Sequence, residues 1–532
     1  NAPWSRPSRR GSRSRPSEGC DSNPLVISRS LGVAKSGGSV EDRGVKQQNS
    51  TLPPGFEGIA AQAEDLWRTA LEGDAVGAWM PDLLTAEEVV VEFSRTLALG
   101  MLQRFVDVRQ AQAADNRSVC ACGTAPVVHR VTKWRRETLV GPVEVKDPYL
   151  YCRTCGDSAR PLHAHLGTSR ETWSLVVQEA AVDLAADESC GKAVEKLERH
   201  HPGVQMERTT ALRMLHEHGS RARDFIEDKL AHAKGSLERP RGCRPQGSQR
   251  AEEIEVEFDG GMIPVATLEP IETKPGETPA LTPVRGIPKR RKVCAWQEVK
   301  AGLAQKPGET SRLYSLRPTA GLDQAFSDLL ALAALQGMDN QTEVRGLADG
   351  ALHIRPRMEE TFTGYSFRFI LDRPHAKEHL SSAGAALVPL TKMAAQDWAK
   401  QALTLLETGR AQEVVDELHR YWCASSNDER SRNDILRREA NYFDRNKDVV
   451  AYAEYRERKW STASSEVESC HRSLVQCRVK IPGAWWHPDT VDDILALRVL
   501  KANGWWDEYW QAQRRAWKES ARGRTQHFAD AA

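Results

Sequence analysis

The sequence has no long hydrophobic run and no excess of charge of one sign. Its longest strictly apolar stretch in the middle of the chain, Leu329 to Leu335, has seven residues, whereas a membrane-spanning helix needs about 20. We therefore expect a soluble protein that does not contact membranes. Lysine and arginine number 74 and aspartate and glutamate 73, which excludes a uniformly basic, histone-like protein but not a protein with one basic face.

The first fifty residues have little that could form a core. Ser5 to Pro16 contains only serine, arginine, proline and glycine, a composition that buries too little surface to fold. We predict a disordered basic tail over 1–53, with a nucleic-acid-binding arm as the alternative. The chain begins with Asn1 and not with methionine, which is typical of a fragment or of an extended reading frame.

Cysteine is sparse, with 11 in 532 residues, and most are scattered singly. A secreted disulfide framework needs a dense, even set in a short chain, so we expect a reducing, cytoplasmic compartment. Two close pairs stand apart: Cys120-Ala-Cys122 and Cys152-Arg-Thr-Cys155, each followed by glycine. Four thiolates on two such turns can converge on one tetrahedral Zn²⁺, which predicts a zinc-ribbon-like domain.

The first cysteine pair is one residue shorter than the usual spacing. His163 or His165 is therefore a substitute ligand if Cys120 or Cys122 points away. The alternative is four reduced cysteines in a small core without metal.

Helical periodicity follows between Glu171 and Leu230. Tight breaks divide it into three short helices, the third from about Glu207 to His218. This pattern fits a helix-turn-helix, whose last helix would present Arg208, Thr209 and Arg213 to a DNA groove. Three helices that only pack together are the alternative.

Acidic residues then recur at the ends of predicted strands. Alternating polarity predicts a first strand and a meander, and a helix and two further strands follow. Three predicted strands end at an acid: Glu253 to Phe258 at Asp259-Gly260, Glu343 to Ala348 at Asp349-Gly350, and Ser366 to Leu371 at Asp372. Asp-Gly alone is a common turn. Repeated at strand ends in this order, it favours a mixed α/β domain of the ribonuclease-H type in which the acids meet.

Several motifs in this order resemble the bacterial ISKra-type insertion-sequence transposases, within the Mutator-like DDE group. The resemblance covers about residues 55 to 515. The motifs that carry it are Phe258-Asp-Gly-Gly-Met-Ile-Pro264, Trp296-Gln-Glu-Val-Lys-Ala-Gly302, Ala348-Asp-Gly-Ala351, Ile370-Leu-Asp-Arg-Pro-His375, Ser464-Ser-Glu-Val-Glu-Ser-Cys470 and Ile494-Leu-Ala-Leu-Arg498.

The resemblance implies that Asp259, Asp349 and Glu468 are the catalytic acids. Val467 matches the valine before the family's glutamate and so selects Glu468, which on a helix points about 200° away from Glu466. It also implies that Asp372 and His375 are active-site neighbours. Three carboxylates suit two Mg²⁺ (or Mn²⁺) ions, which prefer oxygen ligands and can support in-line phosphoryl transfer.

Basic and aromatic residues late in the chain are further candidates. Arg478 and Lys480 are predicted phosphate contacts, and Lys289 to Lys292 is either a phosphate contact or a solvated loop. We expect the tryptophans at 485, 486, 505, 506 and 510 to form core or interface in preference to base-stacking platforms.

The predicted fold class is a multidomain α/β protein: a ribonuclease-H-like catalytic core with a helical insertion, preceded by a zinc ribbon and a helix-turn-helix. The predicted order of segments is the tail over 1–53, an N-terminal helical region over 54–115, the ribbon over 116–168, the helix-turn-helix over 169–233, a linker over 234–250, the first part of the core over 251–383, the helical insertion over 384–440, the last part of the core over 441–482 and a helical C-terminal tail over 483–532.

The leading hypothesis is a DDE transposase that cleaves DNA and transfers strands of an insertion sequence. Its expected partners are double-stranded DNA, as terminal inverted repeats and target, and a second copy of the chain in synapsis; its expected location is the bacterial cytoplasm, on the nucleoid. The alternative is a domesticated or inactive DNA-binding copy, favoured by Ala463-Ser464-Ser465 where the family has Gly-Ser-Gly. A stand-alone ribonuclease-H-type nuclease explains neither the DNA-binding segments nor the insertion.

Overall fold

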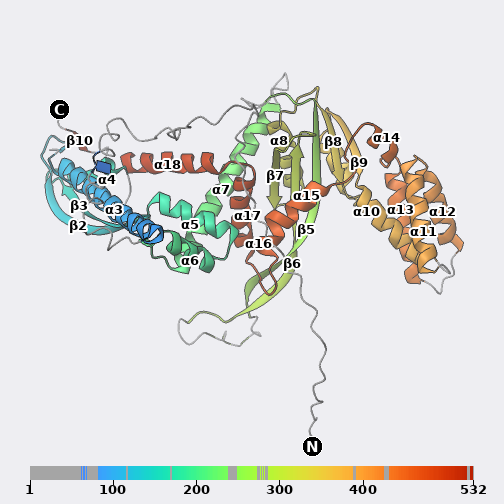
Figure 1. The fold of residues 1–532 in the computed structure, drawn as a ribbon, viewed down its shortest axis with the longest axis horizontal. Coiled ribbons are helices and arrows are strands. Elements are labelled where there is room, and N and C mark those ends of the chain that lie inside the picture. Colours follow the sequence, from blue (N-terminus) through green and yellow to red (C-terminus); the bar gives the residue numbers. More distant parts are fainter. Residues whose placement is uncertain are drawn as a thin grey trace, which may run out of the picture. The chain divides into compact units, whose positions relative to one another are not determined.

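The computed structural model is a mixed α/β protein (Figure 1). N-terminal to residue 82 it describes only Gln62, Glu64, Asp65 and Arg68; from 82 to 530 it describes the chain except 116–117, 168–170, 238–248, short stretches between 272 and 285, 388–390, 425–429 and 524–527. The predicted tail over 1–53 lies outside the described residues. No helix in the described part is long and apolar enough to cross a membrane.

A long helix and a small sheet come first. Helix α3 (Leu83–Asp115) precedes β1 (Ser118–Cys120), and a three-stranded sheet follows with the order β2 (Val127–Thr138), β3 (Gly141–Tyr151), β4 (Ser158–Ala159), before α4 (Pro161–Leu166). Val106 and Ala113 of α3 share one apolar cluster with Val143 and Val145 of β3. Strand β1 pairs with β10 (Phe528–Asp530) from the other end of the chain, a pairing that the helical tail predicted over 483–532 did not include.

Three helices occupy the next segment: α5 (Leu175–Asp187), α6 (Cys190–His200) and α7 (Arg208–Leu237). Ser174 and Ser189 cap the first two by accepting hydrogen bonds from Val177 N and Lys192 N. Helix α7 continues well past the predicted end at His218 because its apolar face stays buried through Ala233, and it covers the first residues of the predicted linker.

A five-stranded sheet lies at the centre of the described chain, with the order β7-β6-β5-β8-β9. Strands β5 (Glu253–Pro270), β6 (Arg290–Gln305) and β7 (Arg312–Arg317) are antiparallel, and β8 (Glu343–Ala348) and β9 (Ser366–Leu371) run parallel to β5. Helix α8 (Leu322–Leu335) covers the face that carries Phe258, whose ring stacks on Phe326 at 4.5 Å between centroids. The opposite face carries Glu257 and Asp259.

The remaining elements are helical. They are α9 (Ile354–Thr361), α10 (Arg373–Ala386), α11 (Lys392–Glu407), α12 (Ala411–Ala424), α13 (Arg430–Asn446), α14 (Tyr452–Glu457), α15 (Ser465–Cys470), the π-helix η2 (His471–Gln476), α16 (Cys477–Val479), α17 (Pro488–Ala502) and α18 (Trp506–Gly523). Helices α11 to α13 fill the segment predicted as an insertion. Helix α15 then returns to β5 and β6.

Candidate functional site

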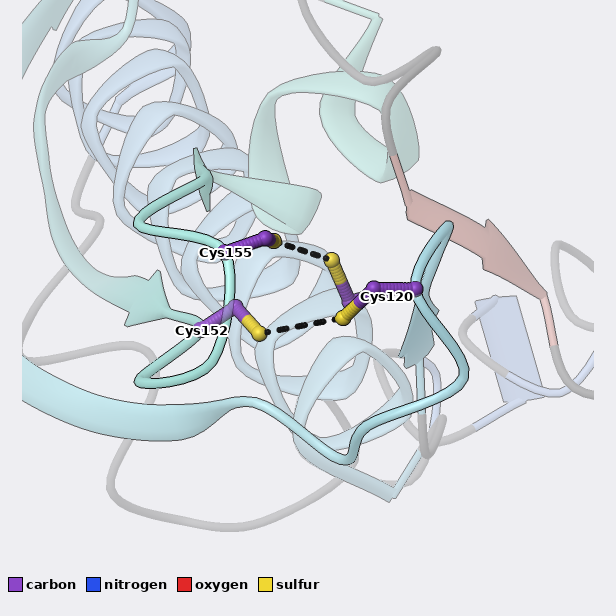
Figure 2. Close-up of side chains that lie close together, drawn as sticks. Cys120, Cys152 and Cys155 are labelled. Carbon is purple, nitrogen blue, oxygen red and sulfur yellow. Dashed lines mark hydrogen bonds between the residues drawn. The ribbon is translucent and has the colours of Figure 1, made fainter.

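The four cysteines form a cluster that can hold a metal ion. Their sulfur atoms all lie within 4.8 Å of one another, with 3.2 Å between Cys120 Sγ and Cys155 Sγ and 3.5 Å between Cys122 Sγ and Cys152 Sγ. Figure 2 shows Cys152 and Cys155 on one turn, facing Cys120 on the other. Four thiolates at about 2.3 Å from a tetrahedral Zn²⁺ are about 3.8 Å apart, so the cluster fits zinc without rearrangement of the backbone.

Two similar backbone turns place these cysteines. Gly123 and Gly156, directly after each pair, have φ of 81° and 78°, a left-handed conformation that glycine adopts without strain. Gly123 N donates to Cys120 O and Gly156 N to Cys152 O. Hydrogen bonds from Thr124 lower the pKa of Cys122 to about 6, which favours the thiolate that a metal needs. The first turn is one residue shorter than the second, because Gly123 N bonds to the carbonyl three residues back and Gly156 N to the carbonyl four residues back.

His163 is not a substitute ligand in this arrangement. Its buried ring has Nε2 at 3.2 Å from Asp147 Oδ2, and Asp147 also pairs with Arg160. The side chain of His165 lies outside the described residues.

The two predicted aspartates of the core lie side by side. Phe258 is in register with Ala348 on the parallel strands β5 and β8, so Asp259 and Asp349 follow at the same level of the sheet. Ala348 is also in register with Leu371 of β9, which brings Asp372 to that level. Three acids separated by up to 113 positions in the sequence thus share one edge of the sheet.

Asp372 is fully buried and holds two segments together. Its Oδ1 accepts hydrogen bonds from Ser464 N at 2.7 Å and Ser464 Oγ at 3.1 Å. Its Oδ2 accepts from His375 N at 2.8 Å and lies 2.6 Å from His375 Nδ1. Asp372 therefore caps α10 and ties it to the segment before α15.

The carboxyl group of Asp259 is half-buried beside two histidines. Burial and then the charge of Asp349 raise its pKa, while His471, the Gly260 N–H and His375 oppose the shift. His471 Nε2 lies 3.3 Å from Asp259 O and 3.6 Å from Asp259 Oδ2. His471 begins the π-helix, an element that is rare and often found at functional sites. Sequence reasoning missed His471, because no local pattern marks a π-helix.

The two candidate glutamates on α15 have different surroundings. Glu466 pairs with Arg312 of β7 at 3.0 Å, whereas Glu468 is partly exposed and lies 3.6 Å from Arg472. Glu468 precedes His471 by three residues, so the two lie on one face of the helix. Glu468 therefore lies on the same face as His471, the first residue of η2, which contacts Asp259.

Glu257 is a second residue that sequence reasoning missed. It is buried beneath α15, and its Oε2 accepts a hydrogen bond from Val467 N at 2.8 Å. Burial, with the nearby charges of Glu255 and Glu466, raises its pKa to about 8 although the Val467 N–H opposes the shift. Its place in the alternating pattern of β5, on the same face as Asp259, was the available signal. Glu257 anchors the residue next to Glu468.

The acids do not close around a single ion. Among the described residues, the only group of three or more candidate ligands within 4.8 Å of one another is the cysteine cluster. The donor set still suits magnesium, because Asp259, Asp349 and Glu468 offer only carboxylate oxygens. A pair of ions about 3.5–4 Å apart also needs its ligands spread more widely than one ion does.

The predicted DNA-binding residues fall into two groups. Arg208, Thr209 and Arg213 are exposed on the first turns of α7 and Lys480 is exposed after α16. Arg478 is 2% exposed, and its Nη2 donates to Ala185 O at 3.2 Å. A phosphate contact requires an accessible guanidinium, which Arg478 does not present.

No protein-family model matches the chain, and no curated protein matches it.

Proposed function

We propose that this protein is a DDE transposase of a bacterial insertion sequence. The observation that carries the proposal is the shared level of Asp259 and Asp349 on neighbouring parallel strands, with Glu468 on a helix that returns to the same face after a helical insertion. The resemblance of the motifs around these residues to the ISKra-type transposases supports the same assignment.

The sheet supports a ribonuclease-H-like core. Numbered by their order within the core, its strands run 3-2-1-4-5, with the first three antiparallel and the last two parallel to strand 1. This order places the ends of strands 1 and 4 together at the centre of the sheet, where carboxylates from distant parts of the sequence can act jointly.

The acids have distinct roles in the proposed reaction. Bound Mg²⁺ or Mn²⁺ would activate the nucleophile and stabilise the leaving oxygen of an in-line displacement at phosphorus. Asp259 and Asp349 would hold the metal ions from the sheet, and Glu468 would complete the ligand set from α15. His375 and His471 beside Asp259 offset the repulsion between the carboxylates.

Two phosphoryl transfers share this site. In the first, water attacks a phosphodiester, a new O–P bond forms and the bond to the 3′-oxygen breaks, which frees a 3′-hydroxyl. In the second, that hydroxyl attacks a phosphodiester of target DNA and displaces another 3′-oxygen. Only the nucleophile differs, so one set of acids serves both steps.

The N-terminal part would recognise the ends of the element. The exposed residues Arg208, Thr209 and Arg213 at the start of α7 suit contacts to double-stranded DNA, and a zinc-loaded cysteine cluster would stabilise the adjoining ribbon. Joining two element ends requires two active sites, so we expect a homodimer or higher oligomer during synapsis, on the nucleoid in the cytoplasm.

The test uses a donor plasmid that carries the gene's flanking DNA. Excision and new insertions are scored with the wild-type chain, with Asp349→Asn and with Asp397→Asn as a matched control on the exposed surface of α11. We expect events with the wild type and the control and none with Asp349→Asn. Equal activity of all three would overturn the catalytic assignment.

A wild-type chain without excision activity would point to one of two other functions. If the wild-type chain binds the flanking ends but yields no excision, the protein is an inactive DNA-binding copy. Cleavage of RNA–DNA hybrids without strand joining would instead indicate a stand-alone nuclease.

A further inference from the structure

Strands β5 and β6 continue beyond the central sheet as a two-stranded arm (Figure 1). Strand β8 pairs with β5 only as far as Phe258, and β7 pairs with β6 only over Lys300 to Gln305. Beyond these points β5 and β6 pair with each other as far as Pro270 and Arg290. Trp486 forms a β-bridge with Val265 of the arm.

Two tryptophans lie together on the arm and are open to solvent. Trp296 of β6 is 57% exposed and Trp485 is 37% exposed. Their rings meet edge to face, with 6.3 Å between centroids. Large aromatic side chains are costly to leave in water, and an exposed aromatic pair therefore indicates a binding surface.

A lysine ammonium group lies near each of the two indole rings. Lys292 Nζ lies 5.6 Å from the ring of Trp485, and Lys480 Nζ lies 6.0 Å from the ring of Trp296. Lys289, Arg290 and Arg291 are exposed just before Lys292. This patch, formed by Trp296, Trp485, Lys292 and Lys480, thus combines flat apolar rings with positive charge.

We propose that the patch binds unpaired nucleotides of a DNA strand. Aromatic rings stack on bases and lysines contact the phosphates between them, which is how single strands are bound without sequence preference. A duplex hides the faces of its bases, so these rings can stack only on bases that are unpaired. A second copy of the chain is a poor occupant, because a symmetric contact would place the lysines of one patch against their own copies.

The patch and the acids hold different parts of the DNA. Trp296 is opposite Pro264, five residues along β5 from Asp259, or about 17 Å at 3.3 Å per residue. Because side chains alternate between faces, Pro264 and Trp296 lie on the face opposite to Asp259. The patch therefore binds a separate stretch of strand; naming DNA as that strand rests on the proposed function.

The other C-terminal tryptophans serve the core. Trp510 is fully buried, Trp505 is 8% exposed and the Trp486 indole N–H donates to Val479 O at 2.8 Å. The expectation that all five form core or interface thus fits these three and Trp506, which is partly buried against the core, but not the exposed Trp485.

The test measures binding of a labelled single-stranded oligothymidylate of about 12 nucleotides to the full chain by fluorescence anisotropy. We expect Trp296→Ala and Trp485→Ala each to weaken binding by roughly 5- to 150-fold, the effect of losing one stacked base. Trp296→Phe should retain most of the affinity. Tyr421→Ala is the matched control, because Tyr421 on α12 is exposed to a similar extent at 39%.

Two further measurements make the result specific. Lys292→Gln and Lys480→Gln should each lower the salt dependence of binding by about 0.7 in log–log slope, the value of one single-strand phosphate contact. Binding of a blunt duplex should be unchanged by Trp296→Ala.

Wild-type affinity for the single strand in both alanine variants would overturn the proposal. So would an equal loss on the duplex, or a change in oligomeric state with single-strand binding intact. These outcomes do not depend on catalysis, since binding is measured without cleavage. A negative excision assay therefore does not affect the binding test, and a negative binding test does not affect the assignment of the catalytic acids.

Discussion

His375 is the residue whose protonation the site changes most clearly. Its hydrogen bond to Asp372, with the charges of Asp372, Asp349 and Asp259, raises its pKa to about 9 against burial. Burial raises the pKa of Asp372, but the hydrogen bonds from His375 and Ser464 outweigh it and hold the pKa below 3.8. The pair is therefore ionised across neutral pH.

The first prediction concerns stability against pH. The His375 pKa is raised in the fold, so its contribution is fully present below about pH 6.5 and is lost as the pH rises through about 9. Asp372→Asn should cost about 3–5 kcal/mol of unfolding free energy near pH 6, and less above pH 9. Denaturation at both pH values measures this. An NMR-determined pKa near 6.5 for His375 in the wild type would contradict it.

The second prediction concerns Gly261. A Cβ at this position would lie 2.5 Å from His471 Nδ1, a buried ring atom with little room to move. Gly261→Ala should displace His471 from Asp259 and lower the rate of DNA nicking by about tenfold or more, which corresponds to about 1.4 kcal/mol. Gly260→Ala is the control, because its Cβ meets only the flexible end of Glu298. Equal rates in the two variants would remove His471 from the site.

At the scale of elements, zinc binding and the stability of the zinc-ribbon-like segment depend on its two cysteine turns. We predict that the purified chain holds about one Zn²⁺ and that Cys152→Ser loses it, because three thiolates bind zinc more weakly than four. Cys294→Ser is the control, since Cys294 is exposed on β6 outside the cluster. Elemental analysis and thermal unfolding measure both effects. Retention of zinc by Cys152→Ser would place the ion elsewhere.

The alternation of polar and apolar residues predicted the bounds of β8 and β9 to the residue. These are the strands that Asp349 and Asp372 follow. The pairing of β1 with β10 and the π-helix at His471 had no local signal, because each depends on contacts between distant segments. The register that aligns the acids is likewise a property of the assembled sheet. The sequence therefore predicted the three acids and their neighbours Asp372 and His375, but not His471 or Glu257.

The segment before α15 differs from the family's motif, but the difference does not strain its backbone. Loss of the two glycines around Ser464 suggested lost backbone freedom, yet in the described residues the one non-glycine with positive φ is Lys459. Ala463 and Ser465 therefore carry no strain of this kind. The Ser464 hydroxyl and N–H instead hold Asp372. We predict that Ala463→Gly leaves nicking unchanged within about twofold, and that a large gain would show the substitution to be a defect.

On the scale of the whole described chain, α17 joins the N-terminal helices to the central sheet. Its residues Val491 to Leu500 are all buried, and it contacts α7, α5 and β7. Asp493 of α17 binds His216 at 2.6 Å and Arg223 at 3.1 Å, both on α7. The predicted DNA-binding helix and the sheet with the acids are thus packed together by α17 and also by α8, which contacts both α7 and β6, and we expect them to unfold together.

Two glycines of α7 test this coupling. A Cβ on Gly219 would lie 2.4 Å from Asp493 Cβ, whereas a Cβ on Gly235 meets nothing within 4 Å. Gly219→Ala should separate α7 from α17 and cost about 1–3 kcal/mol as overpacking. Gly235→Ala should stabilise by up to about 1 kcal/mol, because alanine favours a helix over glycine. Urea unfolding is followed by tryptophan fluorescence and by circular dichroism, and both signals should report one shared transition. Its midpoint should fall in Gly219→Ala and rise in Gly235→Ala. If the wild type or Gly235→Ala already shows two separate transitions, the segments are not coupled, and DNA recognition and cleavage would rest on independently folding parts.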